Sequence, residues 1–181
     1  MRNRVNVILE SFEHYNYFIK NIKNNSSQYY YYVSNYELEE ILLDRKEQVI
    51  NILSIESNKK LNNHLCEKIH EICSFISGKK SPLLNIFHED YNYFESIERS
   101  LKTLLLAISY KYKSFLSVYQ ISKQNNTKLI VLGDSKLSDE NHLSLDLNRY
   151  ENLFLNFANY YTKENIEVYD LANINYKFKY Y

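Results

Sequence analysis

Short β-branched apolar segments alternate along this chain with segments of helical periodicity, and this alternation constrains the fold more than any other feature. Four segments are expected to form short strands: residues 5–9, 29–33, 128–132 and 166–169. Apolar residues recur at helical spacing from Phe12 to Ile22 and again over residues 143–161. Strands that are separated by helices predict an α/β fold with a small, mostly parallel sheet.

The middle of the chain predicts two long helices, over residues 58–78 and 93–124, with a break near Pro82. Two adjacent long helices indicate a long antiparallel helical arm. The predicted head is therefore discontinuous, with residues 1–57 and 125–181 in the head and residues 58–124 in the arm. Residues 37–55 have a mostly helical period. With only two Gly and one Pro in 181 residues, a turn-dense β-sandwich is excluded.

The two cysteines indicate a reducing environment. Cys66 and Cys73 are seven residues apart in one predicted helix, about 10 Å along its axis, which a disulfide cannot span. The N-terminal segment has no small-residue cleavage site, and no run of about 18 apolar residues occurs in the sequence. A cytoplasmic protein with no membrane partner is expected.

Basic residues are concentrated in one predicted helix, although the formal net charge of the chain is zero. Residues 99–128 contain six basic residues and no acidic residue. At about 100° per residue, Arg99, Lys102 and Lys113 lie on one flank of the helix and Lys111 on the other. Such a flank can follow a nucleic-acid backbone without reading bases. The alternative is a solvated helix face that meets an acidic surface of the same protein.

Two short motifs resemble catalytic sequences but lack essential parts. Residues 78–81 (GKKS) resemble the end of a phosphate-binding loop, without its earlier glycine or its preceding strand. Residues 132–135 (LGDS) resemble the nucleophile block of GDS-type esterases, with Ser135 as the nucleophile. Asp139 and His142 have the spacing of the other two catalytic residues but follow Ser135 too closely. No enzymatic activity is therefore expected.

An acidic turn between the two predicted arm helices is a candidate cation site. Glu89 and Asp90 are adjacent there, and paired carboxylates on a loop can hold a hard cation such as Ca²⁺. Capping of the following helix by Asp90 explains the same residues without a metal. The five histidines do not stand at zinc-ligand spacing with either cysteine.

The order of these elements resembles the Csn-two family, the ring-forming spacer-acquisition protein of type II-A CRISPR systems. Nearly the whole chain takes part. The segments that carry the resemblance are residues 5–20, 37–71, 88–91 with 97–101, 111–136 and 166–169. Family members begin with additional strands before the one expected at Val5, so this chain resembles a short variant with a trimmed head.

The resemblance implies a kinase-like α/β core without a working phosphate loop. It also implies a homotetrameric ring with a basic channel that threads onto double-stranded DNA ends, structural Ca²⁺, and cooperation with the CRISPR integrase complex and effector nuclease. It implies no catalysis. Carried over to this chain, the DNA-facing residues are those of the basic helix and the start of the preceding one, and the metal ligands are Glu89 and Asp90. The DNA-facing set is Lys59, Lys60, Arg99, Lys102, Lys111, Lys113 and Lys123.

Two alternatives to a DNA clamp remain. One is a small, mostly helical protein-interaction module, for example a viral host modulator that presents a hydrophobic groove to a partner helix and does not bind DNA. The other is the GDS-type hydrolase.

Overall fold

A computed structural model of the chain describes residues 3–55, 59–77, 93–134, 153–161 and 165–171, with the side chains of residues 59–62, 76–77 and 93–98 left undescribed. The chain divides into two compact units, residues 1–55 with 114–181 and residues 56–113. This division falls inside a helix, whereas the sequence pattern placed the end of the arm at residue 124.

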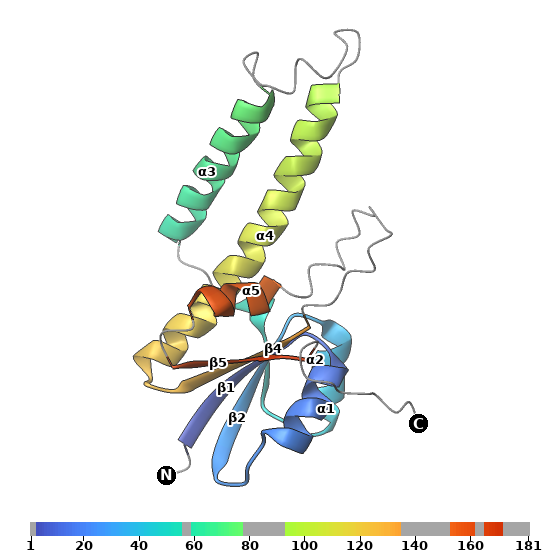
Figure 1. Ribbon diagram of the computed structural model, residues 1–181, viewed down its shortest axis with the longest axis vertical. Helices are drawn as coiled ribbons and strands as arrows, with labels where there is room; N and C mark the ends of the chain where they lie inside the picture. Colours follow the sequence, from blue (N-terminus) through green and yellow to red (C-terminus); the bar gives the residue numbers. More distant parts are fainter. Residues whose placement is uncertain (1–2, 56–58, 78–92, 135–152, 162–164, 172–181) are drawn as a thin grey trace. The chain divides into compact units, whose positions relative to one another are not determined.

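The first unit is built on a five-stranded, all-parallel sheet (Figure 1). Its strands are β1 (Asn3–Leu9), β2 (Ser27–Val33), β3 (Val49–Asn51), β4 (Lys128–Gly133) and β5 (Ile166–Asp170), in the order β3-β2-β1-β4-β5. After β1, the chain adds β2 and then β3 on one side of it. Later, β4 pairs with the other side of β1, and β5 pairs with β4. The predicted α/β class with a small parallel-sheet head is confirmed.

Helices cover both faces of this sheet. The helices α1 (Phe12–Asn21) and α2 (Tyr36–Asp44) pack on one face, where Phe18 and Leu42 are fully buried. The end of α4 (Tyr93–Gln124) and α5 (Leu153–Tyr160) pack on the other face through Phe115 and Phe154. Within β4, Ile130 belongs to the first core and its neighbours Leu129 and Val131 to the second. Both faces of the sheet are covered in this way, which explains the uninterrupted apolar run of residues 129–132 in β4.

Side-chain caps set the beginnings of α1 and α2. The Ser11 hydroxyl accepts a hydrogen bond from the backbone N–H of His14 (3.3 Å), and the side-chain Oδ1 of Asn35 accepts one from the backbone N–H of Glu37 (2.9 Å). After α2 the chain turns at Lys46, whose φ is 60°. Residues 37–55, whose sequence pattern was mostly helical, form a helix only as far as Asp44. After the turn at Lys46, the chain forms β3 beside β2 and then a short 3₁₀ helix, η1 (Ile52–Ser54).

The second unit consists of α3 (Lys59–Ser77) and the first part of α4, which run in opposite directions (Figure 1). Ile69 and Cys73, one turn apart on α3, are both buried, as is Ser109 on α4. Cys66 is exposed and both cysteines are free, in agreement with the expected absence of a disulfide between them. Among the described residues, no helix combines the length and apolar character needed to cross a membrane.

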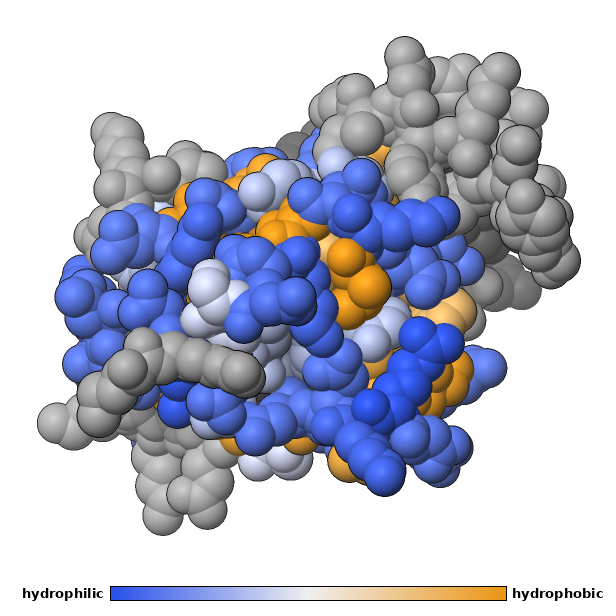
Figure 2. All heavy atoms as spheres, turned by 90° about the horizontal axis from the view of Figure 1, so that it is seen from below, coloured by the Kyte–Doolittle hydropathy of each residue, from blue (hydrophilic) through white to orange (hydrophobic). Residues whose placement is uncertain are grey.

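The surface seen in Figure 2 is mostly hydrophilic, with a smaller hydrophobic area near its centre. Large apolar side chains are nevertheless exposed on several described helices: Tyr36, Leu43, Ile72, Phe75, Leu106, Tyr110 and Tyr160. Four of these residues lie in the helical second unit.

Candidate nucleic-acid interface

Four of the predicted DNA-binding residues lie on the part of α4 that belongs to the second unit. Arg99 and Lys102 are exposed, whereas Lys111 and Lys113 are half-buried. Lys102 and Lys113 are eleven positions apart, which places them about 16 Å from each other along the helix axis and within about 20° around it. Lys111, nine positions after Lys102, lies on the opposite side. The exposed part of the basic flank is therefore carried by Arg99 and Lys102.

The remaining predicted DNA-binding residues are Lys59, Lys60 and Lys123. Lys59 and Lys60 begin α3, and their side chains fall outside the described part of the chain. Lys123 is exposed in the last turn of α4, within the first unit, where a cation also complements the partial negative charge of the helix end. The predicted metal ligands Glu89 and Asp90 lie outside the described residues.

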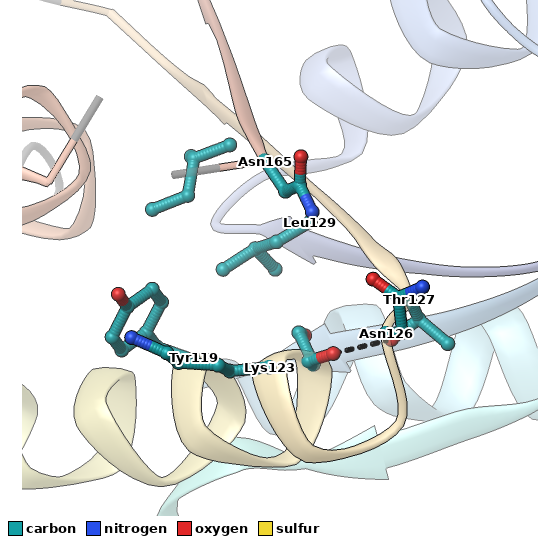
Figure 3. Close-up of a pocket in the computed structure, with 8 residues that line it drawn as sticks. Tyr119, Lys123, Asn126, Thr127, Leu129 and Asn165 are labelled. Atoms are coloured by element: carbon teal, nitrogen blue, oxygen red, sulfur yellow. Dashed lines mark hydrogen bonds between the residues drawn. The ribbon is translucent and has the colours of Figure 1, made fainter. Parts of the chain in front are cut away.

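Lys123 borders a pocket of about 320 Å³ at the edge of the sheet where β4 and β5 begin (Figure 3). Tyr119 and Lys123 lie next to each other on α4, with the Lys123 Nζ 5.9 Å from the centre of the Tyr119 ring. Asn165, just before β5, lies on the opposite wall, and Leu129 of β4 lies between them. Asn126 and Thr127 close the pocket at the turn between α4 and β4.

A buried polar network holds this end of α4 on the sheet. Asn6, in the middle of β1, has no exposed surface. Its Nδ2 donates to Ser122 Oγ (2.8 Å) and to Thr127 Oγ1 (3.1 Å), and its Oδ1 accepts from Arg4 Nε (3.3 Å). The Ser122 hydroxyl in turn donates to the backbone oxygen of Val118 (2.9 Å). A buried amide that has all its hydrogen bonds fixes the geometry of the groups that it joins. The network therefore fixes Ser122 and Thr127, which line the pocket.

A second polar group lies at the carboxyl ends of the strands, opposite the pocket. It is at the point where the strand order reverses between β1 and β4. Ligands of doubly wound sheets usually bind at such a point, at the carboxyl ends of the strands. Here Glu10, which follows β1, is 6% exposed, and its backbone N–H donates to Nδ1 of the buried His14 (3.4 Å). Burial lowers the pKa of His14 from 6.5 to about 4, against the opposing influence of Asp134 and Glu13.

This arrangement does not fit a nucleotide phosphate. A phosphate loop needs glycines whose backbone N–H groups point at the anion, whereas the two residues between β1 and α1 are Glu10 and Ser11. Sequence reasoning treated His14 as one of five ordinary histidines, although its position one turn after a buried strand was a usable signal.

Gly133, the glycine of the esterase-like motif, has a packing role. A Cβ at this position would lie 2.8 Å from Cβ of Leu155 in α5. The glycine therefore lets α5 approach β4 closely, which explains its presence without a catalytic role. Ser135, Asp139 and His142 fall outside the described residues.

Within the described ranges, no group of three or more His, Cys, Asp or Glu residues is arranged to hold a metal ion. Comparison of the chain with protein-family models, with curated proteins and with solved structures finds no match.

Proposed function

We propose that this protein is a non-catalytic clamp that binds double-stranded DNA ends without reading their sequence and acts in CRISPR spacer acquisition. The observation that supports this proposal most is the acid-free basic stretch of α4, on which Arg99 and Lys102 are exposed. The parallel-sheet head without a glycine-rich phosphate loop also fits the family that the sequence resembles.

Binding of this kind depends on phosphate neutralisation. Each lysine or arginine that approaches a phosphate releases condensed counterions, which gives affinity that is independent of sequence and falls steeply with salt. A neutral chain can bind DNA in this way when its cations are gathered on one helix. The proposal includes a cytoplasmic homotetrameric ring, structural Ca²⁺ at Glu89 and Asp90, and cooperation with the CRISPR integrase complex and effector nuclease.

A gel-mobility comparison of linear and covalently closed circular duplexes of one sequence tests the proposal. The experiment is run with Ca²⁺ and then with a chelator. A closed ring that loads at ends retards only the linear form, and the chelator weakens the retardation if Ca²⁺ holds the ring together. Equal retardation of both forms would reject the ring while keeping the basic surface, and retardation of neither form would reject DNA binding.

A matched pair of variants tests the assigned residues. We expect the double variant Arg99→Glu, Lys102→Glu to lose binding. Where affinity remains, the slope of its logarithm against the logarithm of the salt concentration should fall by about two, one for each lost phosphate contact. The control is Lys20→Glu, Lys46→Glu, which changes the net charge equally on exposed residues of the sheet unit. Equal loss in both variants would indicate a general charge effect, and full binding by the first variant would exclude these two residues.

A protein-interaction module is the second candidate function, favoured by apolar residues exposed in the helical unit. Ile72 and Phe75 on α3 are 45% and 69% exposed, and Leu106 and Tyr110 on α4 are 40% and 50% exposed. Exposed apolar side chains at helical spacing can form one face of a protein contact. This candidate predicts a chain that binds neither linear nor circular DNA.

A further inference from the structure

The pocket beside Lys123 combines three kinds of polar or aromatic group. Tyr119 supplies an aromatic ring, Lys123 a cation, and Asn126 and Asn165 two side-chain amides. Among the described residues, none that lines the pocket is acidic. Its volume of about 320 Å³ lies within the range of small-molecule sites.

Both asparagines have an unusual backbone conformation. Asn126 has φ 49° and Asn165 has φ 47°, and in the described part of the chain only Lys46 shares this left-handed conformation among residues other than glycine. Left-handed residues of this kind concentrate at functional sites and turns. Among the described residues, neither asparagine side chain takes part in a hydrogen bond within the protein, so each amide has its donors and its acceptor available.

These groups match a nucleotide. A base is planar and packs against an aromatic ring, as in single-strand recognition. Its edge carries donors and acceptors that asparagine amides satisfy. The attached phosphate requires a cation, which Lys123 provides at the pocket border. The adjoining hollow of about 580 Å³ shares Asn126 and Thr127 with the pocket and adds Arg4 and Lys128, of which Lys128 forms an ion pair with Glu167.

We propose that this pocket binds a single unpaired nucleotide at the end of a DNA duplex, with its base against Tyr119 and its phosphate at Lys123. The inference rests on the proposed function for the source of the nucleotide. The pocket lies where β4 and β5 begin, at the opposite ends of the strands from Glu10. The buried Asn6 network fixes Thr127 and the end of α4, so the site is formed before the nucleotide binds.

Glycine substitutions at the two asparagines test the site without straining the backbone. Glycine adopts positive φ freely, so Asn126→Gly with Asn165→Gly removes both amides and leaves both turns intact. Lys46→Gly is the matched control, because Lys46 has φ 60° in the distant turn between α2 and β3. Thermal unfolding of each variant checks that the fold is retained.

The measurement is fluorescence anisotropy with a blunt duplex and with duplexes that carry one unpaired 3′ or 5′ nucleotide, at one salt concentration. We expect the natural chain and the Lys46→Gly control to bind one overhang roughly tenfold more tightly than the blunt duplex. The double asparagine variant should bind blunt and overhang duplexes equally. Equal affinity of the natural chain for all three duplexes would overturn the pocket assignment and leave duplex binding intact. Failure to bind any duplex would overturn both proposals.

Discussion

Burial of His14 makes the stability of the sheet unit depend on pH below neutrality. The pKa of His14 in the folded chain is lowered from 6.5 to about 4, chiefly because the buried imidazolium would lose its hydration. The surrounding carboxyl groups are Glu10, Glu13 and Asp134, of which the last two favour the charged form without overcoming burial. The Glu10 backbone N–H donates to Nδ1, so the neutral imidazole carries its proton on Nε2.

The sign and size of the effect follow from proton linkage. Between pH 6.5 and about pH 4 the unfolded chain binds a proton at His14 that the folded chain does not. Stability is therefore complete above pH 6.5 and falls as the pH drops through this window. With one pH unit equal to about 1.4 kcal/mol, the loss attributable to His14 at pH 5 is about 2 kcal/mol.

Urea unfolding followed by circular dichroism measures this loss in the natural chain and in His14→Asn. The asparagine does not titrate, and its Oδ1 takes the place of Nδ1, so it can still accept the Glu10 N–H. Carboxyl groups titrate in both proteins, so the difference between their stability profiles isolates His14. We expect the natural chain to lose about 2 kcal/mol more than the variant between pH 7.5 and pH 5. Parallel profiles would refute the reasoning, because they would show that His14 titrates alike in the folded and unfolded states.

Three further substitutions test the packing of the sheet unit by urea unfolding. Gly133→Ala should lower the free energy of unfolding by about 1–3 kcal/mol. Adding Leu155→Ala should not restore it, because the added Cβ would clash with Cβ of Leu155, which alanine retains. Full restoration would contradict this geometry. Asn6→Ala should cost about 2 kcal/mol, from two buried hydrogen bonds of about 1 kcal/mol each, and a neutral effect would show that the network does not hold α4. Tyr31→Phe should be neutral or stabilising by up to about 1 kcal/mol, because within the described chain the buried hydroxyl makes no hydrogen bond; a clear loss of stability would reveal a partner for that hydroxyl.

Local sequence patterns predicted most of the secondary structure. The four expected strands coincide with β1, β2, β4 and β5, and the two expected central helices coincide with α3 and α4. These segments were predictable because a strand or helix buried on a parallel sheet needs apolar residues at fixed spacing. β3 was missed because Val49–Asn51 is only three residues long and no glycine or proline separates it from the helix before it.

The site was less predictable than the fold. The basic flank of α4 follows from helical periodicity, which correctly separates Lys111 from Lys102, but periodicity does not tell which cations are exposed. Lys111 and Lys113 are half-buried, whereas Arg99 and Lys102 are exposed. Exposure depends on what packs against the helix, and that information is not in the helix sequence. The expectations for Ca²⁺, for the ring and for DNA remain predictions.

The pocket at Lys123 shows most clearly what sequence reasoning missed. Tyr119, Asn126 and Asn165 were not predicted as site residues from the sequence, and only the pairing of β4 with β5 brings Asn165 to the end of α4. The left-handed asparagines were the available signal, since asparagine adopts positive φ more readily than most residues. In a chain so rich in asparagine, that signal does not single out these two positions.

The sequence by itself determined the alternation of strands and helices, the parallel α/β class and the basic character of one long helix. Each of these depends on contacts between residues close in the chain or on a periodicity that any buried face imposes. Only the tertiary structure decided the strand order, the burial of His14 beside Glu10 and Asp134, and the hydrogen bond between Asn6 and Ser122, which are 116 residues apart. The physical reason is that such contacts form when two cores close on opposite faces of one sheet, and no local pattern specifies which distant residues will meet there.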